Sequence, residues 1–122
     1  MSSKHLIFYR LPVIALCGLI FWQSSYALSF VKPLFPHDDK VFHFIIYAVL
    51  AILTVRDLRQ EKPFRSLKKI ALTAILFSMI YGLSDEIHQA FVPSRCASFF
   101  DFLADSCGSI AGGLIMTKVY DQ

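Results

Sequence analysis

The sequence predicts an all-α protein, a bundle of four transmembrane helices with both termini in the cytoplasm and a polar pocket at the extracytoplasmic end. Three observations lead to this prediction. The 122 residues are 56% hydrophobic, with a mean hydropathy of +0.56, whereas soluble domains have roughly 45–50% apolar residues. The apolar residues form long blocks, and the basic residues gather beside alternate ends of these blocks. A soluble domain of this length cannot bury so much apolar surface, so we expect one membrane domain over residues 1–122.

The lengths of the apolar blocks set the expected helices. A helix needs about 20 residues to cross a hydrocarbon layer of roughly 30 Å. This length predicts spans at about residues 11–31, 37–56, 69–89 and 98–118. The first block can instead be read as a cleaved signal peptide, with Lys4 and Arg10 in its basic region and a small-residue cleavage site at residues 25–27. Retention of the first span is therefore left open at this point.

The charges are distributed asymmetrically about these spans. Nine of the 12 basic residues fall on one side of the expected bilayer: Lys4, Arg10, Arg56, Arg59, Lys62, Arg65, Lys68, Lys69 and Lys118. Six of the nine acidic residues fall on the other: Asp38, Asp39, Asp85, Glu86, Asp101 and Asp105. Because basic residues are retained on the cytoplasmic side, the pattern predicts that both termini are cytoplasmic. The modest net charge of +3 does not indicate a nucleic-acid partner.

The last three predicted spans carry ionisable residues at the same depth, near their outer ends. Since lipid offers no partners for such groups, we expect them to face one another, water or the backbone. Helical spacing places Asp39, His43 and Tyr47 on one face of the second span. Pro93 is expected to end the third span and to leave Arg95 free to fold over the acidic residues.

Three interpretations of this polar cluster stay open. It can be a structural network that fixes the helices relative to one another. It can be a site for a divalent metal ion, with ligands drawn from a set that no sequence spacing enforces: Asp85, His88, His43, Asp101 and Asp105. It can also bind an anionic group or perform acid–base chemistry on it, because a histidine beside carboxylates is readily tuned and an arginine holds phosphate in its planar fork.

The third interpretation assigns roles to individual residues. The candidate catalytic residues are His88, Asp85, Glu86, His43 and Asp101. The candidate substrate-binding residues are Arg95, Lys40, Asp39, Gln89, Tyr47 and Asp105. No residue is assigned to a metal, and no cofactor is identified. The expected partners are the lipid bilayer and an envelope lipid or cell-wall precursor, without nucleic acid, and the oligomeric state is left open.

Two stretches resemble the VanZ-like family, small multi-span membrane proteins named for an accessory protein of teicoplanin resistance. They are "DKVFHFIIYAVLAIL" from Asp39 and "YGLSDEIHQAFVPSRCASFFDFLADSCGSIAGG" from Tyr81. The family pattern is matched by the following residues: Asp39, Lys40, His43, Tyr47, Tyr81, Gly82, Asp85, Glu86, His88, Gln89, Pro93, Arg95, Asp101, Asp105 and Gly108. Asp105 stands where asparagine is commoner in the family, which adds a charge that needs a cation or a proton.

The resemblance implies a multi-pass protein of the bacterial cytoplasmic membrane. The polar cluster, taken together with this resemblance, leads us to expect a protein that binds or processes an envelope component, a lipid-linked or anionic amphiphile, in an outward-facing polar pocket. A link to glycopeptide resistance, as for teicoplanin in the family's namesake, is the expectation that the resemblance adds. The alternative is a membrane scaffold or assembly partner without catalytic activity, in which the polar network is structural.

Overall fold

The computed structural model describes residues 2–25, 35–36, 38–63, 65–93 and 97–121, and every regular element within them is a helix. The first helical segment comprises α1 (Ser3–His5), a π-helical stretch η1 (Leu6–Arg10) and α2 (Leu11–Ser24). The remaining helices are α3 (Asp38–Glu61), α4 (Leu67–Ala90) and α5 (Phe99–Tyr120). Four helical segments, of 22, 24, 24 and 22 residues, are long and apolar enough to cross a membrane. The predicted all-α architecture with four transmembrane helices is therefore confirmed.

The helix boundaries differ from the predicted spans mainly at the ends that carry the basic residues. The first segment begins at Ser3 instead of residue 11, and α3 continues to Glu61 instead of ending at residue 56. Residues 26–31 of the first predicted span lie outside the described residues. The length rule counts only what is needed to cross hydrocarbon. Helical hydrogen bonds can continue beyond that length, and the Lys62 amide still donates to the Leu58 carbonyl oxygen (2.8 Å) at the end of α3.

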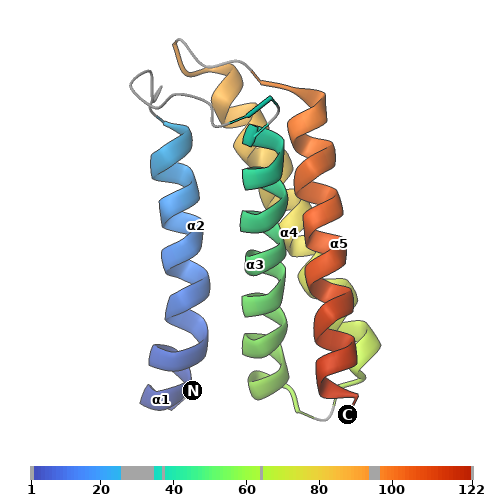
Figure 1. The fold of residues 1–122 in the computed structure, drawn as a ribbon. Helices are drawn as coiled ribbons and strands as arrows, with labels where there is room; N and C mark the ends of the chain where they lie inside the picture. The colour runs from blue at the N-terminus through green and yellow to red at the C-terminus, as the bar shows by residue number, and fades with distance from the viewer. Residues whose placement is uncertain (1, 26–34, 37, 64, 94–96, 122) are drawn as a thin grey trace.

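The helices run alternately up and down, so both chain ends lie at the same end of the bundle (Figure 1). Helices α3, α4 and α5 pack against one another, and the first segment contacts α3 and α4. Polar contacts tie this segment to α4, and they include the following two. The Tyr81 hydroxyl donates to the Cys17 carbonyl oxygen, and the Ser25 hydroxyl lies 3.0 Å from Nε2 of His88.

Helices α3 and α5 approach each other most closely where α5 has glycines. A Cβ atom on Gly108 would collide with the Phe44 carbonyl oxygen, and one on Gly112 would collide with the Ala48 carbonyl oxygen. The spacing of four residues in each helix places both collisions along one crossing. Small residues at such spacing let membrane helices pack backbone to backbone, so the glycines set the distance between α3 and α5.

We expect Gly112→Ala to destabilise the protein, because the added methyl group forces α3 and α5 apart. Overpacking of this kind costs about 1–3 kcal/mol. The matched control is Gly18→Ala, since a Cβ atom on Gly18 would meet nothing within 4 Å. Thermal unfolding of both purified variants in the same detergent measures the difference. Equal melting temperatures for the two variants would show that the crossing can relax without cost.

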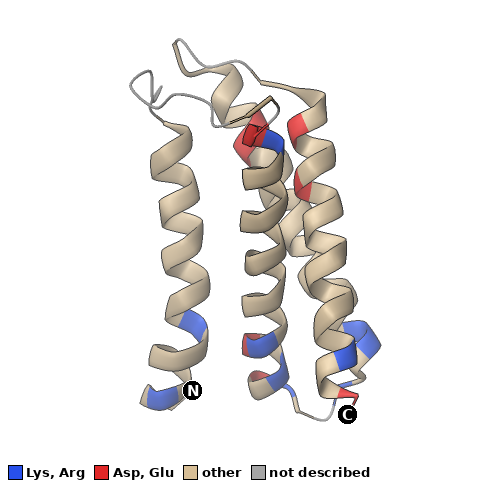
Figure 2. Cartoon of the chain, viewed as in Figure 1, with Lys and Arg blue, Asp and Glu red and all other residues tan. Residues whose placement is uncertain are grey.

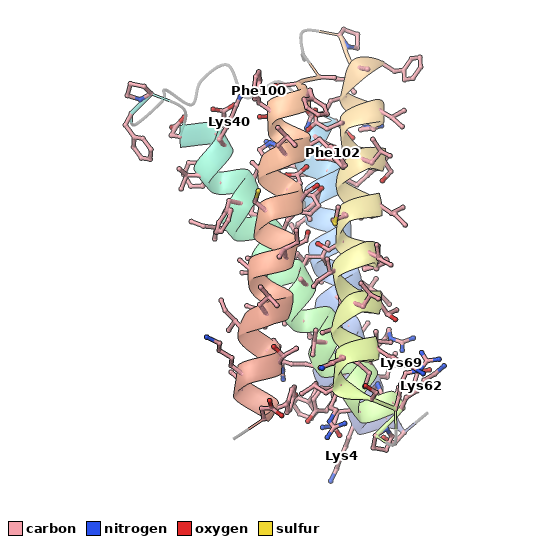
Figure 3. All side chains as sticks on the ribbon, turned by 90° about the vertical axis from the view of Figure 1, so that its right-hand side faces the viewer. Lys4, Lys40, Lys62, Lys69, Phe100 and Phe102 are labelled. Carbon is pink, nitrogen blue, oxygen red and sulfur yellow. The ribbon has the colours of Figure 1, made fainter. Side chains whose placement is uncertain are left out.

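The charged residues separate to the two ends of the bundle (Figure 2). The end that holds both termini, here named the basic end, carries most of the described lysines and arginines: Lys4, Arg10, Arg56, Arg59, Lys62, Arg65, Lys68, Lys69 and Lys118. The opposite end, here named the acidic end, carries six carboxylic acids: Asp38, Asp39, Asp85, Glu86, Asp101 and Asp105. Among the labelled lysines in Figure 3, Lys40 lies at the acidic end, opposite Lys4, Lys62 and Lys69.

Large apolar side chains cover the outside of the bundle between these two ends. Examples are Leu19, Leu72, Ile80 and Leu114, each more than half exposed. Water would solvate such a surface poorly, whereas lipid chains solvate it well. Together with the four long apolar helices, this surface identifies a multi-pass membrane protein.

Candidate functional site

The candidate site lies at the acidic end, where α3, α4 and α5 each contribute polar side chains. Residues one helical turn apart point to the same side of a helix, so His43 and Tyr47 follow one another down α3. Asp101 and Asp105 do the same on α5. The His43 and Tyr47 rings are nearly parallel, with their centroids 6.4 Å apart. The last three predicted spans therefore bring polar residues to one place.

Lys40 and His43 of α3 pair with the two aspartates of α5, Asp101 and Asp105. Nδ1 of His43 lies 2.6 Å from Oδ1 of Asp105, and its Nε2 lies 3.9 Å from Oδ2 of Asp101. Nζ of Lys40 lies 2.9 Å from Oδ1 of Asp101 and 2.7 Å from Oδ2 of Asp39. The imidazole and the ammonium group are thus both held by carboxylates. This arrangement fixes the orientation of both groups at the acidic end.

Helix α4 contributes Glu86, whose side chain links α4 to the start of α5. The backbone amide of Ser98, the residue before α5, donates to Oε2 of Glu86 (2.9 Å). Glu86 is only 6% exposed. Its carboxylate, the imidazole of His43 and the carboxylate of Asp105 have potential metal-ligating atoms that all lie within 4.8 Å of one another. The sequence-based metal set lacked Glu86.

Asp85 and Gln89 form a second polar layer on α4. The Gln89 amide donates to Oδ2 of Asp85 (3.4 Å), and both side chains are buried. Asp85 and Asp105 are the charged neighbours of the buried Tyr47 hydroxyl. Gly82 makes room for this layer, because a Cβ atom there would come within 3.0 Å of Asp105. The sequence reasoning gave Gly82 no structural role beyond its match to the family pattern.

His88 points away from these residues. Its Nε2 lies 3.0 Å from the Ser25 hydroxyl, and its ring lies against that of Phe21, with centroids 4.6 Å apart. His88 therefore faces α2, although the sequence analysis grouped it with the catalytic candidates. Arg95 lies outside the described residues, so its place over the acidic end stays a prediction.

The basic end contains a polar cluster that the sequence analysis missed. Asp57 is 4% exposed, and its carboxylate contacts Nε2 of His5 (2.6 Å) and Nε of Arg10. Arg10 also pairs with Glu61. The i, i+4 spacing of Asp57 and Glu61 opposite Arg10 was the available indication. These contacts anchor the start of the chain to the end of α3.

We expect Asp57→Ala to destabilise this anchor, because it leaves His5 and Arg10 without their shared buried carboxylate. The loss of a buried charge-assisted partner costs about 1–3 kcal/mol. Glu61→Ala is the matched control, since the Glu61 side chain is 39% exposed and exposed pairs contribute roughly 0–1 kcal/mol. Thermal unfolding in detergent distinguishes the two variants. A melting temperature for Asp57→Ala equal to that of Glu61→Ala would contradict the anchoring role.

A groove of about 430 Å³ lies between the first segment, α3 and α4 toward the basic end. Arg10 and Asp57 line its polar part, and Val13, Cys17 and Phe77 line its apolar part. None of the acidic-end residues described above contributes to its lining. The groove and the acidic end are therefore separate features of the bundle.

The acidic end combines a histidine, a lysine and several carboxylates in a mostly apolar setting. Such a set can move a proton, hold an anionic group through the ammonium, or bind a cation through the carboxylates. Among the described residues at this end, Lys40 is the only lysine or arginine, against six carboxylic acids. The carboxyl groups thus outnumber the fixed positive charges in this part of the structure.

Comparison with known proteins identifies one family. The sequence model of one family, described as VanZ/LLP1, matches residues 7–120. Searches of curated proteins and of solved structures gave no match. The matched region includes α2, α3, α4 and α5 and every residue of the acidic end. This match covers nearly the whole chain, and the protein therefore belongs to the VanZ/LLP1 family.

Proposed function

We propose that this protein lies in the bacterial cytoplasmic membrane, with its basic end in the cytoplasm and its acidic end facing outward. The basic residues of the connection between α3 and α4, together with those near both termini, support this orientation. The contacts of His5 and Arg10 with Asp57, and of Tyr81 with Cys17, support retention of the first span. A signal peptide removed by cleavage would leave Asp57 without these partners.

At the outward end, the protein binds or processes an anionic envelope amphiphile, such as a lipid or a lipid-linked cell-wall precursor. The observation that supports this most directly is the convergence of Lys40 and His43 on α5. Their side chains lie 2.9 Å from Asp101 and 2.6 Å from Asp105, respectively. Lys40 also shares Asp101 with His43, whose Nε2 lies 3.9 Å from Oδ2 of that residue. In the proposed orientation, both groups lie near the outer end of the helices, where a lipid headgroup can reach them.

The two side chains suit different parts of the task. Lys40 has 32% of its side-chain surface exposed, so its ammonium group can contact a phosphate or carboxylate while Asp39 and Asp101 orient it. His43 is held by Asp105, which fixes the ring and favours proton transfer at the other nitrogen. Binding requires only Lys40, whereas processing also requires His43.

A connection with glycopeptide resistance, as in the namesake of the family, is part of the same proposal. By altering the availability of an envelope amphiphile, the protein would change the sensitivity of the cell to teicoplanin. The family match supports this proposal, and the acidic end offers the site at which it would operate.

A structural role for the same network is the second candidate. The bond from Ser98 to Glu86 joins α4 to α5, and the His43–Asp105 pair joins α3 to α5. A scaffold or assembly partner would use these contacts to fix three helices without binding any amphiphile. The two candidates differ in what a substitution that preserves the fold does to the cell.

The test compares cells that contain the wild-type protein, no protein, or the His43→Gln variant. Lipid profiles and teicoplanin sensitivity are measured together with the amount of protein in the membrane. Processing at the acidic end is supported if His43→Gln reproduces the deletion at normal protein levels, while Asp121→Asn, an exposed control at the other end, does not. A deletion phenotype that His43→Gln leaves untouched favours the scaffold. A deletion without any envelope phenotype contradicts the proposed function.

A further inference from the structure

The acidic end contains buried carboxylate oxygens without hydrogen-bond partners. Among the described residues, no hydrogen bond reaches Oε1 of Glu86 or Oδ2 of Asp105. The residues that carry these oxygens are 6% and 0% exposed, respectively. A buried carboxylate oxygen without a partner is costly, so a ligand that supplies positive charge here would stabilise the site.

The geometry of three residues fits a metal ion. His43, Glu86 and Asp105 come from α3, α4 and α5, and each offers a ligating atom within 4.8 Å of those of the other two. Metal–ligand bonds of about 2.0–2.2 Å place ligands of one ion roughly 3–4.4 Å apart. Shifts of a few tenths of an ångström in these side chains would therefore bring all three onto one ion.

The charges of neighbouring side chains agree with this fit. Lys40 is engaged by Asp39 and Asp101, so it does not neutralise Glu86 or Asp105. The carboxylate of Asp105 contacts His43, at 2.6 Å between Oδ1 and Nδ1. A divalent cation would compensate both carboxylates and retain the imidazole as a third ligand.

We propose that His43, Glu86 and Asp105 form a binding site for a divalent transition-metal ion, with Zn²⁺ and Mn²⁺ as the ions that a mixed nitrogen and oxygen ligand set suits best. Three protein ligands leave coordination positions open. An anionic headgroup can occupy one of these, which explains how an end rich in carboxylates attracts an anion. This use of the ion rests on the proposed function, whereas binding of the ion itself does not.

Metal binding is tested on the purified full-length protein in detergent, prepared without a histidine tag and washed with a chelator. Calorimetric titration with ZnCl2 or MnCl2 alone is expected to show one ion per chain. Glu86→Gln and Asp105→Asn are expected to weaken binding more than about 10-fold, because even loss of an outer partner of a metal ligand costs about 10–100-fold. Asp57→Asn, which alters the cluster at the basic end, is the matched control and should leave the affinity unchanged.

Three results would overturn the proposal: no binding by the wild type, binding that both substitutions leave unchanged, or equal loss in the Asp57→Asn control. If either variant fails to fold, the wild type still decides the matter. Bound Mn²⁺ should show magnetic coupling to an imidazole nitrogen, and its absence would rule out His43 as a ligand.

The outcome is independent of the cellular test. A protein that binds no metal while His43→Gln still alters envelope lipids keeps the proposed function and loses the metal site. A protein that binds metal without any envelope phenotype keeps the site and loses the function.

Discussion

Replacement of Asp105 by alanine is expected to cause the largest loss of stability at the acidic end. The substitution removes the carboxylate that lies 2.6 Å from Nδ1 of His43, and it does so at a position with no exposed surface. An unpaired buried polar group costs about 1–3 kcal/mol, and the cavity left by the side chain adds to this cost. We therefore expect a clear fall in the melting temperature of the protein in detergent.

The isosteric variant Asp105→Asn separates hydrogen bonding from charge. An amide oxygen can still accept a hydrogen bond from Nδ1 of a neutral His43, so we expect this variant to stay within about 1 kcal/mol of the wild type. Asp121→Ala, at an exposed position near the C-terminus, controls for the loss of an aspartate as such. If Asp105→Ala and Asp121→Ala have the same melting temperature, the His43–Asp105 pair contributes nothing to the stability of the fold.

Replacement of Lys40 by methionine is expected to give the largest loss of amphiphile binding. Methionine preserves much of the apolar stem of the lysine but removes the ammonium group. Among the residues that the structure describes at the acidic end, this group is the one fixed positive charge. A hydrogen bond to a charged partner contributes about 1.5–3 kcal/mol, which corresponds to a loss of roughly 10- to 150-fold in affinity. Binding of a fluorescent phosphatidic acid to the protein in neutral-lipid nanodiscs measures this change.

Two further variants sharpen the interpretation of this binding experiment. Lys40→Arg keeps the positive charge and should retain most of the affinity, whereas Lys118→Met removes a lysine at the other end of α5 and should have no effect. Equal affinities for Lys40→Met and Lys118→Met would place the headgroup away from Lys40. In that case the contacts of Lys40 with Asp39 and Asp101 are structural.

Much of the fold follows from the sequence because the bilayer imposes a simple length requirement. Counting about 20 residues from the basic flanks put Asp39, Lys40 and His43 at the same depth as Asp101 and Asp105. The structure then brings His43 to Asp105 and Lys40 to Asp101. Depth was the part of this convergence that the sequence could predict.

The directions of individual side chains around each helix were harder to predict. Glu86 and His88 are two residues apart, so they differ by roughly 200° around α4 at 3.6 residues per turn. Once Glu86 faces α5, His88 must face elsewhere, and it contacts Ser25 and Phe21. The spacing excluded a shared site for both residues, but the rotation of α4 was needed to decide which one enters it.

The anchor at the basic end was missed for a different reason. Hydropathy treats Asp57 as part of a solvated, basic stretch, although the side chain is buried against His5 and Arg10. The partners lie more than 45 residues away in sequence, and the i, i+4 spacing of Asp57 and Glu61 does not identify them. Only the packing of the first segment on α3 reveals that this carboxylate is enclosed.

The close crossing of α3 and α5 also determines the alignment of the polar side chains above it. Gly108 lies three residues after Asp105, and its contact on α3, Phe44, is the neighbour of His43. If α5 slid along α3 by one residue, the two glycines would be replaced either by Cys107 and Ala111 or by Ser109 and Gly113. In both cases at least one Cβ atom would collide with a carbonyl oxygen of α3. The two glycines thus favour one longitudinal position of α5 along α3. In this position Gly108 faces Phe44 and Gly112 faces Ala48. The same alignment of the two helices brings His43 opposite Asp105.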